Sequence, residues 1–213
     1  MSDMAPDGSP VDVYLALSPE PDLSRVRSVL RPGWSVLDLG CGVGRIANAL
    51  CHAGHAVVAV DNSPDMLTHV RGPEPLLHDI WTLDLDRRFD AVLALSHLVN
   101  GRTRERRLGL LSVCRHHLRE GGVVVVQRYP PEWNPTDETS RVDGVEVQLH
   151  DVRIFGDGFS ATVTYAIGDR SWAQPFEAAI VDDEELSSLA EAAGLRFRGV
   201  LDEQQTCALL TTE

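Results

Sequence analysis

The chain has 213 residues, a length typical of a single domain, and 43% hydrophobic and 24% charged residues, as in an ordinary globular protein. Its formal net charge is −13 at pH 7. An acidic chain lacks the basic face that binds nucleic acid or an anionic membrane surface, so we expect neither as a partner.

The first part of the chain alternates between helix and strand. Residues 1–10, rich in Pro, Gly, Ser and Asp, are predicted to form a disordered tail. Helices are expected at 11–17, at 22–30, at 44–53, from Ser63 onward and at 104–118. Strands are expected at 36–39, 56–60, 75–77, 89–95 and 123–126. Strands that alternate with helices in this way predict a parallel, doubly wound α/β sheet.

The second part of the chain has a different pattern. Apolar and polar residues alternate over 145–152, 159–167 and 171–179, which indicates antiparallel strands. A helix over 182–193 and strands over 195–201 and 206–211 complete the predicted elements. We therefore expect one domain over 11–213, in which residues 130–180 form an antiparallel insertion.

Residues 36–45 are the most informative segment. An apolar strand contains Asp38 near its end, and Gly40, Gly42 and Gly44 follow at alternate positions before a helical pattern begins. Glycine permits positive φ angles and the close approach of a ligand, and a helix that begins here directs free N–H groups at that ligand. The segment predicts a nucleotide-type cofactor at the carboxyl end of the first strand.

Two further carboxylates follow the next two strands. Asp61 can accept hydrogen bonds from both ribose hydroxyls of an adenosine, and Asp79, beside the apolar Ile80, can accept one from an adenine amino group. The glycine spacing is G-x-G-x-G, which differs from the G-x-G-x-x-G of dinucleotide sites. Asp38 is better placed for an ammonium group than for a pyrophosphate. S-adenosylmethionine is the cofactor that meets these requirements.

At these residues the chain resembles the class I S-adenosylmethionine-dependent methyltransferases. The matching stretches are 36–44, 58–67, 78–80, 89–92 and 118–122, although Glu120 stands where the family usually has Pro. The resemblance implies a Rossmann-like, seven-stranded sheet of order 3-2-1-4-5-7-6, with the antiparallel insertion after the fifth strand. It also implies that eleven residues line the cofactor site: Asp38, Gly40, Cys41, Gly42, Asp61, Asn62, Met66, Asp79, Ile80, Leu95 and Ser96.

A looser likeness concerns the acceptor side. The helices over 11–32, expected to lie over the active site, and the insertion over 130–180 are similar to those of small bacterial N-methyltransferases. That group includes enzymes that dimethylate nucleotide-linked amino sugars. Its insertion covers the substrate pocket and can mediate dimer contacts. We therefore expect a small-molecule acceptor, and either a monomer or a homodimer.

Five residues are candidates for contact with the acceptor. His97, after the fourth strand, is the leading candidate for a general base, and Tyr14 is the second. His97 can equally cap a helix or face solvent, and Tyr14 can equally be a packed aromatic ring. Arg128 and Tyr129 end the fifth strand at the ligand-binding edge, and Trp133 either covers the site or anchors its own loop.

The expected location of the protein is the cytoplasm. The four cysteines form no CxxC pair, which fits a reducing compartment and argues against a bound metal. No stretch approaches the roughly 20 apolar residues of a membrane span, and residues 1–10 lack the apolar core of a signal peptide.

The predicted function is methyl transfer from S-adenosylmethionine to a small molecule. Carboxylates near the predicted lid, such as Asp137 and Glu138, slightly favour an amine over a hydroxyl as the acceptor. Two alternatives remain open at this point. One is a different sulfonium reaction on the same fold, such as a cyclisation, and the other is a protein that binds the cofactor without catalysis.

Overall fold

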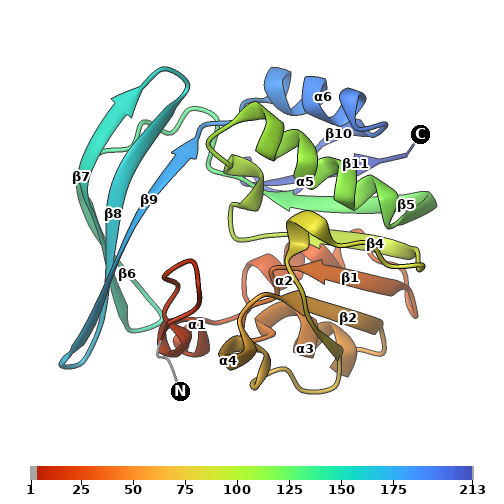
Figure 1. Cartoon of the computed structure of the whole chain (residues 1–213), viewed down its shortest axis with the longest axis horizontal. Helices are drawn as coiled ribbons and strands as arrows, with labels where there is room; N and C mark the ends of the chain where they lie inside the picture. Colours follow the sequence, from red (N-terminus) through yellow and green to blue (C-terminus); the bar gives the residue numbers. More distant parts are fainter. Residues whose placement is uncertain (1–3, 213) are drawn as a thin grey trace.

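The computed structural model describes residues 4–212 and contains two sheets (Figure 1). The larger sheet has seven strands in the order β10-β11-β5-β4-β1-β2-β3. They are β1 (Ser35–Leu39), β2 (Ala56–Asp61), β3 (Glu74–Leu77), β4 (Phe89–Ala94), β5 (Leu118–Gln127), β10 (Arg196–Val200) and β11 (Cys207–Thr211). Neighbours among β1 to β5 pair parallel, and β11 pairs antiparallel with both β5 and β10. Because β10 and β11 are the sixth and seventh strands of this sheet, the predicted order 3-2-1-4-5-7-6 is confirmed.

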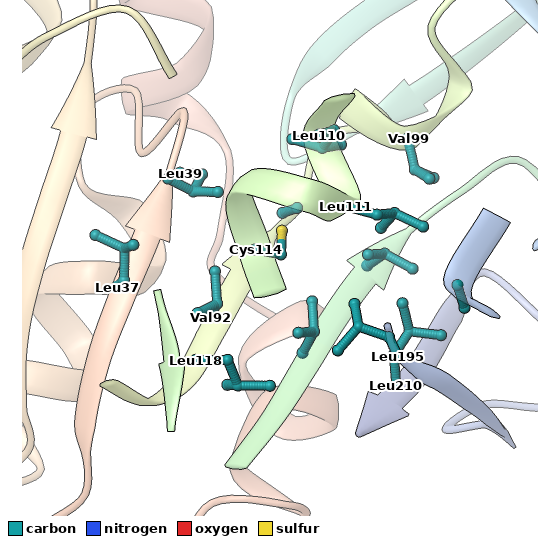
Figure 2. Packing of buried hydrophobic residues seen from close by; sticks show 14 of the residues in the cluster. Leu37, Leu39, Val92, Val99, Leu110, Leu111, Cys114, Leu118, Leu195 and Leu210 are labelled. Atoms are coloured by element: carbon teal, nitrogen blue, oxygen red, sulfur yellow. The ribbon is translucent and has the colours of Figure 1, made fainter. Parts of the chain in front are cut away.

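Helices cover both faces of the larger sheet. On one face, α2 (Asp22–Arg27) and α3 (Arg45–His52) pack apolar side chains against the strands. On the other face, α5 (Arg104–His116) and α6 (Asp183–Ala192) do the same. Figure 2 shows Leu110, Leu111 and Cys114 of α5 among the buried residues that contact the sheet. Burial on both faces explains why β4 and β5 contain nearly continuous apolar runs.

The second sheet consists of four antiparallel strands and is here called the insertion sheet. Its strands are β6 (Glu138–Val142), β7 (Val145–Phe155), β8 (Gly158–Ile167) and β9 (Arg170–Ala179), paired in that order. The sequence predicts β7, β8 and β9 but not β6. All five residues of β6 are exposed at the edge of the sheet, so no alternation of apolar and polar residues marks this strand.

Short helices connect these parts. They are α1 (Val11–Ala16), α4 (Pro64–Leu67), and the 3₁₀ helices η1 (Ile80–Thr82) and η2 (Leu98–Asn100). In Figure 1, α1 lies between the insertion sheet and the α/β body. Among residues 4–212, no helix has the length and apolar content needed to cross a membrane.

Residues 4–10 form a compact loop, where the sequence predicts disorder over 1–10. Met4 and Pro10 pair across an isolated bridge, and the Ala5 amide donates to the Ser9 carbonyl at 2.8 Å. The Asp7 carboxylate accepts from the amide and hydroxyl of Ser9. Burial of Ala5 in an apolar cluster with residues of α1, the glycine loop and α4 explains why polar composition misled the prediction. Residues 1–3 lie outside the described residues.

The N-terminal segment contacts both sheets. Asp12 pairs with Arg170 of β9, and the amide of Ser18 donates to Asp143, between β6 and β7, at 2.8 Å. On the other side, Arg45 at the start of α3 pairs with Asp22 at 3.2 Å. These contacts hold residues 4–22 between the insertion sheet and the glycine loop.

Candidate functional site

The glycine loop follows β1 and has the backbone that its residues predict. Gly40, Gly42 and Gly44 have φ angles of 67°, 56° and 78°, a region that side chains other than glycine rarely adopt. The Cys41 amide donates to the Val60 carbonyl at 2.9 Å, which ties the loop to the end of β2. A Cβ atom on Gly40 would lie 3.1 Å from Leu98 Cδ1, so a side chain here would also have to displace Leu98. The loop thereby brings backbone close to an adjoining cavity.

Asp61, at the end of β2, connects the loop to the next element. One carboxylate oxygen accepts from the Gly42 amide at 2.8 Å, and the other accepts from the Ser63 amide at 2.9 Å. Burial raises the pKa of this carboxyl, and the two backbone hydrogen bonds oppose the rise. The Ser63 hydroxyl in turn caps α4 by accepting from the Met66 amide.

Two adjoining hollows lie at this edge of the sheet, and together they are called the cofactor cavity. The larger has a volume of about 210 Å³, and its lining includes Gly40, Gly42, Asp61, Asn62, Met66, Asp79, Ile80 and Ser96. The smaller, of about 30 Å³, is lined in part by Asp38, Cys41 and Leu95. The structure therefore brings all eleven predicted cofactor residues to one place.

A third cavity, here called the acceptor cavity, lies between the carboxyl ends of β4 and β5 and the insertion sheet. It has a volume of about 500 Å³. Four predicted acceptor residues line it: Tyr14, His97, Tyr129 and Trp133. The His97 and Tyr129 rings are stacked with centroids 4.2 Å apart, and the Trp133 ring lies 4.8 Å from that of Tyr129. Tyr14 and Ser96 line this cavity and both hollows of the cofactor cavity, so the three spaces meet there.

Comparison with known proteins identifies the domain that carries these cavities. Residues 36–122 match a family model described as a methyltransferase domain. Over these residues the chain is similar to the class I methyltransferases. The cofactor of that class is S-adenosylmethionine, and the matched residues include the whole glycine loop together with Asp61 and Asp79.

Two curated bacterial proteins match parts of the chain. The cypemycin N-terminal methyltransferase of Streptomyces sp is 36% identical over 124 residues, which cover 54% of this chain and 51% of that protein. The dTDP-3-amino-3,4,6-trideoxy-alpha-D-glucopyranose N,N-dimethyltransferase of Streptomyces venezuelae is 34% identical over 115 residues, covering 52% and 47%. The chain thus spans about half the length of these relatives in the matched region.

Solved structures share the fold over nearly the whole chain. The SAM-bound structure of CalS10, an amino pentose methyltransferase from Micromonospora echinaspora, aligns with a TM-score of 0.75 at 22% identity, over 95% of both chains. Because the alignment covers 95% of this chain, it includes the insertion sheet. The arrangement of two sheets is therefore shared with that structure and is not confined to this chain.

The cofactor cavity of the methyltransferase domain fits S-adenosylmethionine in its chemistry. A Cβ atom on Gly40 would crowd Leu98. Gly42 has no side chain, so its backbone is not covered where it lies beside Asp61. Asp38 is buried beside the smaller hollow, where an ammonium group would neutralise it. Burial raises the pKa of Asp38 to about 7, against the charge of Arg45, and Asp61 adds to the rise. A buried carboxyl with this pKa is a site suited to a cationic partner.

A polar network that sequence reasoning missed links the two cavities. Asp22, at the start of α2, accepts from Arg45 and, at 3.1 Å, from the Gln127 side chain. The Gln127 oxygen accepts from the Ser96 amide at 2.8 Å. Asp22 and Gln127 lie in ordinary helical and strand contexts, and no local motif marks either of them.

His97 and Tyr14 lie where a general base was predicted, and both are partly exposed to the cavities that they line. Burial lowers the pKa of His97 to about 4, although the charge of Asp22 and the backbone of Arg128 oppose the shift. His97 Nδ1 is buried and has no hydrogen-bond partner among the described residues. Burial raises the pKa of Tyr14 above its usual value, and a hydrogen bond with Ser9 opposes this. At neutral pH the imidazole is uncharged and the phenol keeps its proton.

Arg128 does not reach the acceptor cavity, contrary to the sequence prediction. Its side chain is fully buried, donates to the Val181 carbonyl at 3.1 Å and to the Gln205 carbonyl at 3.2 Å, and pairs with Asp183. Successive strand residues point to opposite faces, so Arg128 turns toward α6 while its neighbours Gln127 and Tyr129 do not. Arg128 therefore fastens the segment between β9 and α6 to the end of β5.

Most other lining residues come from parts of the chain with no recognisable signal, although Trp81 directly follows the predicted Ile80. Asp7 and Ser9 line both the acceptor cavity and the larger hollow of the cofactor cavity. Trp81 and Arg106 line that larger hollow, and the Arg106 guanidinium lies 4.2 Å from the centre of the Trp81 ring. Only the tertiary fold brings these residues to the site.

Proposed function

We propose that this chain transfers the methyl group of S-adenosylmethionine to an amine nitrogen of a small-molecule acceptor. The observation that carries the proposal is the junction at Tyr14 and Ser96, where the cofactor cavity opens onto the acceptor cavity. Two groups held on either side of such a junction can react in line. The proposal for nitrogen is supported by the names of the two curated relatives, one an N-terminal methyltransferase and the other an N,N-dimethyltransferase of an amino sugar.

On the cofactor side, we assign six of the eleven lining residues to distinct parts of the ligand. Asp61 binds the ribose, and Asp79 and Ile80 contact the adenine edge, flanked by Asn62 and Met66. The cofactor, when bound, supplies an electrophilic sulfonium methyl group, so the protein needs to provide alignment and exclusion of water more than acid catalysis.

Asp38 lies at the opposite end of the proposed site. Its carboxyl faces the smaller hollow together with Gly40, Cys41 and Leu95. We assign it to the cofactor ammonium group, because a cation at this position would favour the ionised carboxylate that burial alone disfavours.

On the acceptor side, Tyr14 and His97 are proposed to contact the nucleophile. A neutral imidazole can accept a hydrogen bond from an amine N–H and orient the nitrogen lone pair toward the junction. The low pKa of His97 makes it a weak base, so we expect an acceptor that enters the cavity as an ammonium to lose its proton to water there before its nitrogen reaches the junction. Tyr129 and Trp133 exclude water from the reacting nitrogen.

The test is turnover with a panel of amines and alcohols, in which formation of S-adenosylhomocysteine and of the methylated product is followed by mass spectrometry. We expect amines to be methylated and His97→Ala to lower kcat with little change in cofactor KM. Methylthioadenosine in place of S-adenosylhomocysteine would indicate a different sulfonium reaction. Tight cofactor binding with no turnover across the whole panel would contradict the proposal.

A further inference from the structure

The acceptor cavity has a composition that selects among amines, and the following inference rests on the proposed function. Its walls are largely apolar and aromatic. They come from all three longer strands of the insertion sheet and from the loop after β5, and they include Tyr129, Trp133, Val147, Val163, Tyr165 and Phe176. Aromatic faces attract organic cations, and apolar walls bury a hydrophobic body.

The charged groups of this cavity are all acidic. Among the described residues that line it, Asp7, Glu138 and Glu177 carry carboxylates, and none is an arginine. The sequence contains no lysine, so all 19 of its basic residues are arginines. His97 adds no positive charge near neutral pH, because burial lowers its pKa to about 4. The cavity therefore offers no cation to a bound anion.

Three arginines of neighbouring elements are engaged elsewhere. Arg102 pairs with Asp157 at 3.0 Å and lies over the Phe155 ring. Arg170 pairs with Asp12 on the outer side of α1. Arg106 lies over Trp81 and lines the cofactor cavity. A diphosphate needs cationic or amide donors that match its oxygens, and these side chains are already paired or face another site.

Two of the carboxylates are positioned by the fold. Glu138 pairs in register with Leu149 of β7, so both side chains lie on the face of the insertion sheet that borders the cavity. Asp7 lies at the boundary with the cofactor cavity and is oriented by hydrogen bonds from the amide and hydroxyl of Ser9, at 2.9 Å and 3.0 Å. A cationic amine that moves toward the junction would therefore meet a carboxylate at both ends of its path, first Glu138 and then Asp7.

We propose that the acceptor is a phosphate-free amine that arrives as a cation on an apolar or aromatic body, and that amines linked to a nucleoside diphosphate are excluded. This separates the chain from its curated relative whose name specifies a dTDP-linked amino sugar. The separation is one of charge: the same cavity that stabilises an ammonium group repels two phosphates.

The test compares acceptors in the presence of saturating S-adenosylmethionine, with S-adenosylhomocysteine formation as the readout. One set contains phenethylamine and related phosphate-free aromatic amines, and the other a dTDP-linked amino sugar and its phosphate-free methyl glycoside. We expect kcat/KM for the best aromatic amine to exceed that for the dTDP-linked sugar by about 100-fold or more. Faster turnover of the dTDP-linked sugar would overturn the inference and leave the proposed function intact. No turnover with either set would overturn the proposed function, and the inference with it.

A charge reversal within the insertion sheet provides a second readout. Glu138→Arg should raise the KM of the aromatic amine about tenfold and lower that of the dTDP-linked sugar, and Glu138→Gln should act in the same direction but more weakly. Glu146→Arg is the matched control, because Glu146 alternates with the cavity-facing Val147 and is exposed. All three variants should bind S-adenosylhomocysteine normally, which shows that they fold. Equal effects of Glu138→Arg and Glu146→Arg on the amine KM would contradict the inference.

Discussion

The two cavities of this molecule are built in different ways. The cofactor cavity is built around a fixed backbone loop, with positive φ angles at Gly40 and Gly42 and the Gly42 amide held by Asp61. The acceptor cavity is formed largely by side chains from strands of the insertion sheet and from the loop after β5. Backbone geometry at a strand end fixes one ligand type, whereas side chains on a separate sheet can change without disturbing the fold. This difference suggests that cofactor identity and acceptor choice can be altered independently.

The largest expected effect comes from a substitution in the glycine loop of the cofactor cavity. Gly42→Val places a branched side chain at a φ of 56° in the wall of the cofactor cavity. We expect affinity for S-adenosylhomocysteine, measured by isothermal titration calorimetry, to fall by about 100-fold or more, because the ligand and the new side chain compete for one space.

Gly33→Val is the control for that substitution. Gly33 also has a positive φ, of 76°, and a Cβ there would meet no atom within 4 Å. Both variants should lose a comparable stability, about 1–2 kcal/mol from the left-handed backbone alone. If Gly33→Val weakened ligand binding as much as Gly42→Val does, the effect would reflect general destabilisation and not the cavity.

The next effect belongs to the acceptor side. Trp133→Ala removes an aromatic wall that contacts the Tyr129 and Phe159 rings at centroid distances of 4.8 Å and 5.5 Å. We expect the acceptor KM to rise about 20-fold while the cofactor KM changes less than twofold, since the ring lines only the acceptor cavity. Steady-state kinetics with each substrate varied in turn would measure this, and a parallel rise in both KM values would show that the two cavities are not independent.

A pH dependence is expected from Asp38. Its raised pKa of about 7 means that the carboxyl of the free protein is largely protonated at pH 6, and the ligand ammonium group favours the ionised form. Binding below pH 7 therefore releases a proton, and affinity for S-adenosylhomocysteine should fall about fivefold between pH 7 and pH 6. Calorimetry at several pH values would measure the slope. Asp38→Asn should bind more weakly and show no such slope.

Asp38 also affects stability, with a sign that can be checked separately. A carboxyl whose folded pKa lies above its unfolded value destabilises the fold as pH rises from about 4 to about 7. Asp38→Asn should therefore raise the melting temperature at pH 8 and leave it unchanged near pH 4. A lower melting temperature at pH 8 would contradict the view that this carboxyl is retained for binding.

The same contrast explains what the sequence could predict. The glycine loop, Asp61 and Asp79 occupy fixed places relative to consecutive strands, so their convergence at one edge follows from a parallel sheet. The order of the larger sheet follows instead from the resemblance to the class I methyltransferases, because the alternation of strands and helices alone does not set it. Asp7, Asp22 and Gln127 reach the site through contacts between residues 23 to 167 positions apart, such as Gln127 with Asp22 and Gln174 with Asp7. No local pattern encodes such contacts.

Arg128 is the opposite case, in which the sequence predicts a contact that the structure does not contain. Its place at the end of a strand on the ligand-binding edge predicts a substrate contact, yet the alternation of side chains along β5 turns it toward α6. The face of β5 on which a side chain lies depends on its exact position along the strand, and a shift of one residue moves the side chain to the opposite face. Strand ends therefore locate a site more reliably than they select the side chains within it.

The smallest expected effect is at the junction, where the comparison between the two cavities is sharpest. Tyr14→Phe removes a hydroxyl that bonds Ser9, which in turn donates to Asp7, but leaves the ring that lines both cavities. Because the phenol has a raised pKa, it is not a base at neutral pH. We expect kcat to fall only about threefold, with the pH profile between 6 and 9 unchanged.

Tyr165→Phe is the matched variant, since Tyr165 lines the acceptor cavity alone and burial also raises its pKa. It should change the acceptor KM and not kcat. A fall in kcat of more than about 100-fold for Tyr14→Phe, with loss of one limb of the pH profile, would instead make Tyr14 the proton acceptor. In that case Tyr14, and not solvent, would accept the proton of the acceptor. The two cavities could then not be altered independently at this residue.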